Sequence, residues 1–297
     1  MPTTDEPGCA SPIGDAAARR RRRRTRPASW RRGGVWRLVL GLALSICTVL
    51  PLLVMVLGSL KPEAEVTAPA LLPQHPTMAN YVYVFTQVPF ARYMFNSAFI
   101  AGVVTVLALW FHSMAAYALA RLRFPGRETI FLVIFSTLLV SLPVVMVPTF
   151  VIVRTLGLVN SYGGLIIPAI FNAFGIFLLR QFYLSIPGEL EEAALVDGAG
   201  YWRVYWSVIL PLSRPILAAL AVFFFLANWN SFVWPLTITS DPDLRTVQLG
   251  IAGFQQEYGS KWNYVLAAAA VAALPMLLMF FSFQRQIVES IKTAGFK

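Results

Sequence analysis

The segment 187–214 holds the most distinctive arrangement of acidic and small residues in the chain. Four carboxylates lie within nine positions of one another: Glu189, Glu191, Glu192 and Asp197. Glutamates that follow Pro187 favour the first turn of a helix, where the helix dipole stabilises negative charge. Gly198 and Gly200 then permit a sharp change of chain direction. The pattern predicts a short, acidic surface helix followed by a glycine turn.

A second helix is predicted after the turn, from about Tyr201 toward Pro211. The small residues Ala193 and Ala194 on the first helix would let the surface of another protein approach closely. The chemistry expected of this segment is therefore contact with a partner, by shape and charge, and no bond-making step.

Residues suited to catalysis or metal binding are scarce elsewhere. The two histidines, His75 and His112, and the two cysteines, Cys9 and Cys47, show no metal-ligand spacing and no disulfide framework. No nucleophile–base pair can be assembled from the sequence. The phosphate-binding pattern G-x-x-x-x-G-K-[ST] is absent, so the chain is not expected to hydrolyse ATP by itself. The sequence predicts a non-catalytic protein without a metal or a cofactor of its own.

The elements that must position this loop are long and apolar. Of 297 residues, 57% are hydrophobic and 13% are charged, whereas soluble domains carry about 25% charged residues. A helix needs roughly 20 apolar residues to cross a bilayer core. Six charge-free stretches reach that length: 38–60, 93–120, 129–153, 155–179, 215–240 and 262–284. They predict membrane-spanning helices over these stretches, with the fifth at about 212–238.

The distribution of basic residues predicts the orientation. If the amino terminus is cytoplasmic and the six spans alternate, nineteen basic residues lie inside and five lie outside, in agreement with the positive-inside rule. Both termini are then cytoplasmic. The segment 180–214 becomes an inner loop, because its four carboxylates would make insertion into the bilayer prohibitive.

The net charge of +10 comes from an amino-terminal arm and not from the body of the chain. Residues 19–37 contain ten arginines, and such a run of like charges favours disorder. We expect residues 1–36 to form a disordered cytoplasmic arm on anionic headgroups, and 37–297 to form the transmembrane domain. The alternatives are a twin-arginine or secretory signal, although residues 38–60 lack an A-x-A cleavage pattern, and nucleic-acid binding, for which no aromatic–basic surface follows.

The spacing of the loop resembles the EAA loop of bacterial ABC importer permeases. Glu192-Ala193-Ala194 is followed after three residues by Gly198, and after nine more by Val208-Ile209-Leu210-Pro211. Val208 replaces the isoleucine usual in that family. Further stretches resemble its carbohydrate subgroup, for oligosaccharides and related polyols: GSLKPEAEV, PTMANYVYVF, NSAFIAGVVTVLALWFHSMAAYALARLRFPGR, GLVNSYGGLIIP, WNSFVWPL and ESIKTAGFK. The likeness runs from about residue 36 to the end. Ser231 departs from it, since many relatives carry an acidic residue there.

The resemblance implies an inner-membrane permease subunit of an ATP-driven sugar importer. It implies an all-α integral membrane bundle of six helices, with a cytoplasmic coupling helix within about 186–207 that docks in a separate ATPase subunit. The residues that it assigns to coupling are Glu192, Ala193, Ala194, Asp197, Gly198, Leu210 and Pro211. The implied partners are a homologous permease, two subunits that bind ATP and Mg²⁺, an extracytoplasmic sugar-binding protein and membrane lipids. No nucleic acid is implied.

Polar and aromatic residues in the spans are candidates for the substrate pathway, because sugar sites combine aromatic faces with amide and hydroxyl groups. The candidates are Asn228, Trp229, Asn230, Trp234 and Asn172. The asparagines have an alternative role in interhelical hydrogen bonding, and the tryptophans in the interfacial aromatic belt. His112 is expected to be a packed or water-facing polar residue.

Two other transport classes compete with a sugar importer. An ABC permease for another solute would share the loop but differ in the carbohydrate-subgroup stretches. An ion-coupled secondary carrier would need intramembrane acidic residues and often an internal repeat, and no acidic residue lies in the six charge-free stretches. A membrane-embedded enzyme has no support from the residues present.

Overall fold

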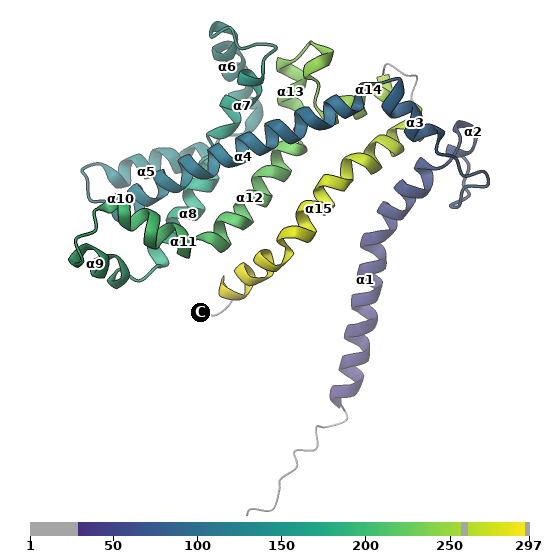
Figure 1. Cartoon of the computed structure of the whole chain (residues 1–297). Coiled ribbons are helices and arrows are strands. Elements are labelled where there is room, and N and C mark those ends of the chain that lie inside the picture. The colour runs from purple at the N-terminus through teal and green to yellow at the C-terminus, as the bar shows by residue number, and fades with distance from the viewer. Residues whose placement is uncertain (1–28, 257–260, 295–297) are drawn as a thin grey trace, which may run out of the picture. The chain divides into compact units, whose positions relative to one another are not determined.

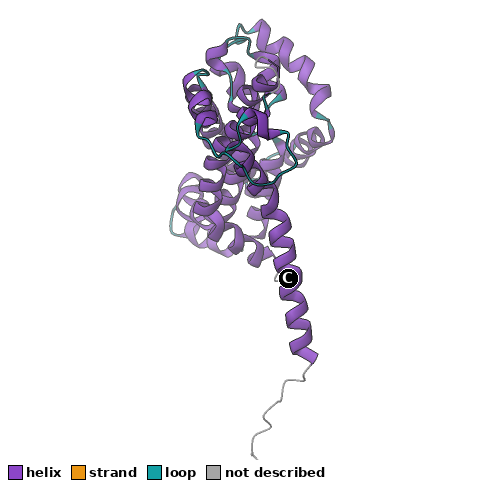
Figure 2. Ribbon diagram, turned by 90° about the vertical axis from the view of Figure 1, so that its right-hand side faces the viewer, coloured by secondary structure: helices purple, strands orange, loops and turns teal. Residues whose placement is uncertain are grey.

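The computed structural model describes residues 29–256 and 261–294. Every regular element within those ranges is a helix (Figure 2), which confirms the predicted all-helical fold for the described part of the chain. The chain divides into two units, Met1–Leu52 and Leu53–Lys297. Residues 1–28 of the predicted arm lie outside the described residues, and the rest of the arm belongs to the first helix.

The helices, in chain order, are α1 (Ser29–Ser59), α2 (Glu63–Val66), α3 (Ala79–Thr86), α4 (Phe90–Arg121), α5 (Arg127–Ser136), α6 (Leu142–Thr155), α7 (Tyr162–Ile170), α8 (Ala173–Ser185), α9 (Glu189–Val196), α10 (Tyr201–Val204), α11 (Leu210–Leu212), α12 (Arg214–Trp229), α13 (Val233–Ile238), α14 (Val247–Gln256) and α15 (Trp262–Ala294). Short 3-10 turns occupy Thr137–Leu139 and Pro242–Leu244, and a π-helical turn occupies Tyr205–Ile209.

Several of these helices are long and apolar enough to cross a membrane. Four pass on length and composition as single segments: Trp36–Ser59, Phe90–Arg121, Tyr162–Ser185 and Trp262–Gln284. Two further pairs pass only as bent segments: Arg127–Leu139 with Pro143–Thr155, and Tyr201–Leu212 with Arg214–Trp229, the second bent by 75°. The described residues therefore hold four to six candidate spans.

Three of the helices predicted from charge-free stretches differ from those in the structure. The predicted helix at 129–153 breaks between α5 and α6, because Pro143 lacks an amide hydrogen and fits the first turn of a new helix after Ser141. The predicted helix at 155–179 begins later, at Tyr162. Gly157 (φ 70°) and Asn160 (φ 55°) adopt left-handed conformations there and turn the chain between α6 and α7.

The same helix also continues past its predicted end, through α8 to Ser185. Arg180, which closes the charge-free stretch, does not end the helix because its charge is paired within the bundle. The predicted helix at 212–238 is interrupted after Trp229, and α13 resumes at Val233.

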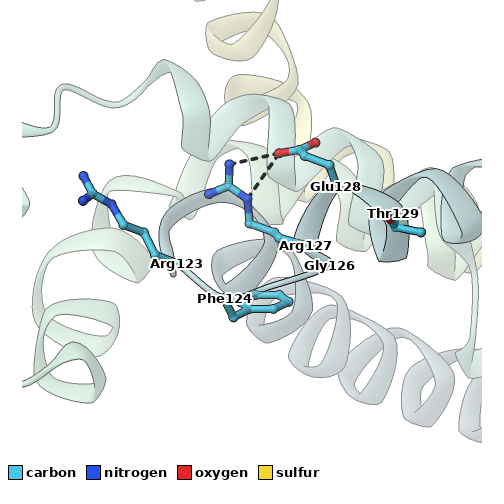
Figure 3. Close-up of a pocket in the computed structure, with 6 residues that line it drawn as sticks. All are labelled: Arg123, Phe124, Gly126, Arg127, Glu128 and Thr129. Atoms are coloured by element: carbon cyan, nitrogen blue, oxygen red, sulfur yellow. Dashed lines mark hydrogen bonds and ion pairs between the residues drawn. The ribbon is translucent and has the colours of Figure 1, made fainter.

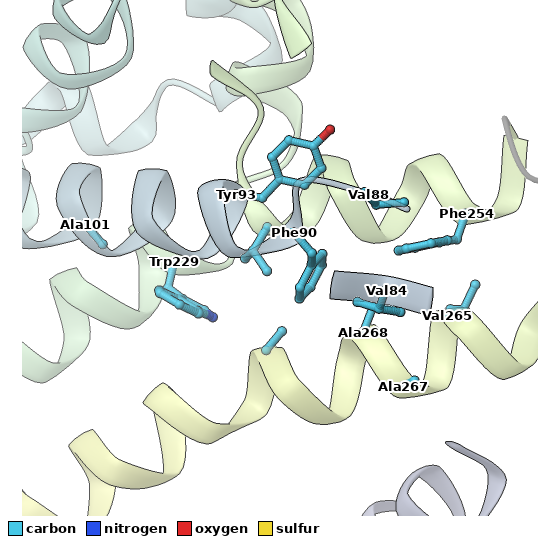
Figure 4. Close-up of a cluster of buried hydrophobic side chains, with 12 residues drawn as sticks. Val84, Val88, Phe90, Tyr93, Ala101, Trp229, Phe254, Val265, Ala267 and Ala268 are labelled. Atoms are coloured by element: carbon cyan, nitrogen blue, oxygen red, sulfur yellow. The ribbon is translucent and has the colours of Figure 1, made fainter. Parts of the chain in front are cut away.

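Helix α4 lies at the centre of the unit Leu53–Lys297 and packs against α7, α8, α12 and α14 (Figure 1). It contributes residues to all three buried apolar clusters. In the cluster of Figure 4, Phe90 and Tyr93 from α4 meet Trp229 from α12 and the fully buried Ala267 and Ala268 from α15. The small side chains on α15 permit the close approach of helices that is typical of membrane bundles.

Candidate coupling helix and substrate pathway

The predicted short acidic helix is α9, which lies beside α10 at one end of the unit Leu53–Lys297 (Figure 1). Three glutamates occupy its first turn, where the unpaired amide groups of the helix favour negative charge. It ends at Val196 with Asp197 as its C-cap, and Gly198 follows with φ 81°. Only glycine adopts that left-handed conformation without steric cost. The predicted helix and glycine turn are thus confirmed.

One face of α9 points away from the bundle. Glu192, Ala193 and Asp197 are exposed, and so is Val196, at 88% of its surface. These positions lie one, three, four or five residues apart, so they share a helical face. Ala194 lies on the other side and is half-buried.

The inward side of α9 packs on a buried cluster that includes Tyr183, Tyr205 and Ile209. Ala194 contacts this cluster, and so does Leu210 from α11. The beginning and the end of the EAA-like segment, at Ala194 and Leu210, therefore contact the same apolar cluster. Pro211, next to Leu210, is exposed.

An ion pair between Arg121 and Glu191 fixes the first turn of α9 to the end of α4. Arg121 Nε lies 2.9 Å from Glu191 Oε1, and the two side chains are only 16% and 12% exposed. Arg121 Nη2 also donates to the carbonyl oxygens of Tyr183, at 2.5 Å, and Ile186. Burial raises the pKa of Glu191 above its usual value, and the nearby Arg121 opposes that shift.

A buried group of hydroxyls joins the same helices further along α4. Ser113 Oγ on α4 is 2.6 Å from the Tyr183 hydroxyl on α8 and 2.8 Å from the Tyr205 hydroxyl in the π-helical turn. All three residues are buried. We call this group the hydroxyl triad. It connects α4, α8 and the segment that follows α9.

A second ion pair ties α8 to α5. Arg180 Nη2 donates to both carboxylate oxygens of Glu128, at 2.9 and 3.0 Å, and Arg180 Nε donates to the carbonyl of Leu119. The guanidinium also lies 3.9 Å from the centre of the Phe131 ring, a favourable cation–π distance. This pairing explains how an arginine is accommodated inside an apolar helix.

The loop between α4 and α5 encloses a surface pocket of about 430 Å³ (Figure 3). Its lining residues are Arg123, Phe124, Gly126, Arg127, Glu128 and Thr129. Arg127 pairs with Glu128 at 2.9 Å (Figure 3). Glu128 is therefore shared between Arg127 and Arg180, so the loop is fastened to the bundle by charge.

The predicted substrate-pathway residues are not brought together into one site. Trp229 is buried in the cluster of Figure 4 at 1% exposure, and its Nε1 has no hydrogen-bond partner among the described residues. Asn228 and Asn230 donate to carbonyl oxygens one turn back on α12, and Asn230 also accepts from Gln248. Of these three residues, only Asn230 is exposed.

The other two pathway candidates form hydrogen bonds with backbone groups. Trp234 Nε1 donates to the carbonyl of Gly164 at 3.0 Å, which ties α13 to α7. The Asn172 side chain caps α8 by accepting from the Phe174 backbone amide at 2.8 Å. The backbone amide of Asn172 donates to His112 Nε2 at 3.2 Å. His112 is fully buried, in agreement with a packed polar residue.

Comparison with known proteins decides the family. Residues 112–293, more than half of the chain, match the family described as "Binding-protein-dependent transport system inner membrane component". The chain belongs to this family. It is a multi-pass permease component of the cytoplasmic membrane.

Individual relatives match the sequence of this permease over most of its length. It is 34% identical to the arabinooligosaccharides transport system permease protein AraQ of Halalkalibacterium halodurans, over 88% of this chain and 96% of that relative. It is 34% identical to the diacetylchitobiose uptake system permease protein NgcG of Streptomyces coelicolor, over 85% of each chain. It is 40% identical to the sn-glycerol-3-phosphate transport system permease protein UgpE of Yersinia enterocolitica, over 69% and 75%.

A solved structure shares the fold of the permease. The crystal structure of a bacterial ABC transporter involved in the import of the acidic polysaccharide alginate matches with a TM-score of 0.77 and 26% identity. The match covers 87% of this chain and 97% of that one. The fold is therefore that of an ABC importer permease.

Sequence reasoning missed the groups that hold α9 in place. Arg121 is one of the nineteen basic residues predicted on the inner side, and Glu191 is predicted only to favour the start of a helix. Seventy positions separate the two in the sequence. The sequence holds one hint that Arg121 has a special place. It directly follows the long apolar stretch that forms α4, including the buried end of that helix.

Proposed function

We propose that this permease forms one half of the membrane pathway of an ATP-driven importer for oligosaccharides or related polyols. Two kinds of support favour this substrate class. The carbohydrate-subgroup stretches extend along the chain outside the EAA loop, and two of the relatives named above serve oligosaccharide uptake by their names. The permease itself would perform no bond-making step.

The proposed topology has six spans and cytoplasmic termini. Four long helices and two bent pairs supply the spans, and the positive-inside count of nineteen against five supports the orientation. A bent pair is acceptable in a bundle because neighbouring helices can satisfy the backbone groups that a break leaves free. In this arrangement α9 faces the cytoplasm.

We assign α9 the role of coupling helix. The observation that carries this assignment is an acidic surface helix that ends at a left-handed glycine and turns Glu192, Ala193 and Asp197 outward. A separate ATPase subunit would bind this face. When two such subunits close on ATP, α9 would be displaced, and the rigid helices behind it would carry the displacement into the membrane pathway.

The proposed complex contains a companion permease in a heterodimer, two ATPase subunits that hold ATP and Mg²⁺, and an extracytoplasmic sugar-binding protein. Membrane lipids surround the spans, and no nucleic acid takes part. Among the pathway candidates, Asn230 is the best placed to meet substrate, because it is exposed at the end of α12. Trp229 would act by packing in the described conformation.

Gly198→Asp tests the coupling role. The substitution adds a carboxylate beside Asp197 in the proposed docking face, so we expect uptake and sugar-stimulated ATP hydrolysis to fall about tenfold or more while the protein still inserts. Gly157→Asp is the matched control, since Gly157 is also exposed, has φ 70°, and has open space where a Cβ would lie. Full transport by the Gly198 variant would contradict the proposal.

The orientation of α9 is tested by a single cysteine. Ala193→Cys, in a background with Cys9 and Cys47 replaced by serine, should react with a membrane-impermeant maleimide only from the cytoplasmic side. It should also crosslink to the ATPase subunit. Labelling only from outside would exclude a coupling role for α9.

A second substrate class has its own support. The relatives in several Yersinia strains are named for sn-glycerol-3-phosphate and reach 40% identity. Uptake of labelled oligosaccharides and of labelled sn-glycerol-3-phosphate by cells that carry the complete transporter separates the two. Uptake of the phosphate ester alone would replace the oligosaccharide proposal and leave the coupling role intact.

A further inference from the structure

The Arg121 side chain meets three separate elements at the base of the bundle. It extends from the last residue of α4, pairs with Glu191 in the first turn of α9, and donates to carbonyl oxygens at the end of α8. The last carbonyl groups of a helix have no partner within the helix; here the guanidinium donates to Tyr183, whose carbonyl also accepts from the Ile186 amide, and to Ile186 just beyond α8. One side chain thus fixes α9 against two long helices.

The energetics of this ion pair argue against a role in stability alone. Removing two charges from water costs free energy that their attraction often fails to repay, and apolar residues of similar size are commonly as stable or more so. The raised pKa of Glu191 agrees, since burial outweighs the attraction to Arg121. What Arg121 supplies is position, because one planar guanidinium both pairs with Glu191 and donates to the carbonyl oxygens of Tyr183 and Ile186.

The helices that Arg121 contacts, α4 and α8, are suited to transmit a displacement of α9 into the bundle. Tyr183 accepts from Arg121 through its carbonyl and joins the hydroxyl triad through its side chain. The end of α8 is therefore held at two points against α4. Helix α4 itself is 32 residues long and enters all three apolar clusters, so a rotation at its Arg121 end would reach the opposite end of the bundle.

We propose that Arg121 and Glu191 form a clamp that fixes the coupling helix to α4, and that they are positioning residues for coupling between ATP hydrolysis and transport. The inference rests on the proposed role of α9. Without the clamp, α9 would still bind the ATPase subunit through its outward face. Its displacement would then be lost locally and would not be transmitted to α4.

The clamp requires an ionised Glu191, so coupling should depend on cytoplasmic pH. The charged and titratable groups that face Glu191 from α4 are Arg121 and Tyr117. On its own helix, Glu189 and Glu192 are exposed. Because burial raises the pKa of Glu191, its protonation, and with it the loss of coupling, should begin at a higher pH than for an exposed glutamate.

Stability should respond to pH in the opposite direction. A carboxyl whose pKa is raised in the folded protein binds its proton more tightly there than in the unfolded chain. The contribution of Glu191 to the free energy of unfolding therefore increases as pH falls through the raised pKa. A pair that only stabilised the fold would not show both changes at low pH, namely weaker coupling between ATP hydrolysis and transport and a larger free energy of unfolding.

Glu191→Gln in the complete transporter, reconstituted with its ATPase subunits and binding protein, tests the clamp. We expect substrate moved per ATP hydrolysed to fall about fivefold or more, with ATPase binding and thermal stability retained. Glu189→Gln, an exposed glutamate in the same turn, is the matched control and should change the ratio by less than about twofold. Arg121→Lys keeps the charge but loses the planar fork, so it should give an intermediate ratio.

The pH profile supplies the second measurement. The wild-type ratio should fall as cytoplasmic pH is lowered, and the Glu191→Gln ratio should be low and flat. An unchanged ratio, or lower stability with normal coupling, would overturn the clamp. If Gly198→Asp abolishes coupling while Glu191→Gln has no effect, the clamp fails and the coupling role of α9 survives. If neither variant has an effect, both fail.

Discussion

Two segments of this permease each hold a glutamate against a nitrogen-bearing side chain, and the two partners differ in burial. Glu191 Oε1 lies 2.9 Å from Arg121 at the buried base of α9. Glu65 Oε1 lies 2.7 Å from His75 Nδ1 in the loop after α1, where the histidine side chain is 83% exposed. The hydrogen bond from His75 lowers the pKa of Glu65, whereas burial raises that of Glu191.

The difference shows that the balance between hydrogen bonds to a carboxylate and its burial sets the sign of the pair's contribution to folding. The Glu65 side chain is 18% exposed, and its carboxylate is hydrogen-bonded to the His75 ring and to the backbone amides of Gln74 and His75, so ionisation favours the folded state. Glu191 gives up hydration, so ionisation opposes folding although a guanidinium lies beside it. A pair of the second kind is expected where position matters more than stability.

The largest effect should come from removing the cation of the buried pair. Arg121→Ala leaves the Glu191 carboxylate without its cation and removes the side-chain donor from the carbonyl oxygens of Tyr183 and Ile186, and breaking a buried pair in this way costs about 3–5 kcal/mol. Denaturant unfolding of the purified permease in detergent measures it. His75→Ala is the matched change in the exposed pair, and we expect only a small decrease there. Equal losses in the two variants would refute the contrast.

An intermediate effect is expected in the hydroxyl triad further along α4. Ser113→Ala and Tyr183→Phe each remove one partner of the 2.6 Å contact. Hydrogen bonds between membrane helices contribute about 0.6 kcal/mol on average in double-mutant cycles. The cycle of these two substitutions should give an interaction energy near that value, and additive effects would show that the hydroxyls do not interact.

The smallest effect should come from the exposed pair. Glu65→Gln should lower the thermal midpoint slightly at neutral pH, because Glu65 then loses the charge that His75 stabilises. The lowered pKa means that this contribution is present above the usual pKa of a glutamate and is lost as pH falls through the lowered value. The difference between wild type and variant should therefore vanish in acid. A difference that grows in acid would contradict the assignment.

Elements whose ends carry charge could be predicted from the sequence alone. Helix α4 was predicted at 93–120 and occupies Phe90–Arg121, because Arg92 and Arg121 bracket a long apolar stretch. Helix α9 was predicted because glutamates and Gly198 mark its two ends. In both cases the signal is local, so no knowledge of distant residues was needed.

Features that depend on distant partners could not be predicted. The charge-free rule stopped a helix at Arg180, although Glu128 and the Phe131 ring let the helix continue to Ser185. Trp229 has the composition of a substrate-binding residue, but tertiary packing buries it. The Arg121–Glu191 pair is invisible for the same reason, since nothing near either residue in the sequence specifies the other.

The π-helical turn at Tyr205–Ile209 has a consequence for comparing relatives by alignment. A π-turn accommodates one residue more than an α-helix would. Because the wider turn absorbs the extra residue, deleting a single residue there would restore regular winding and leave the side chains on both sides of the turn facing as they do now. A homologue with a one-residue gap at this place would therefore present equivalent side chains on the helix that leads back to α9, and the gap in the alignment would mark the loss of the π-turn alone.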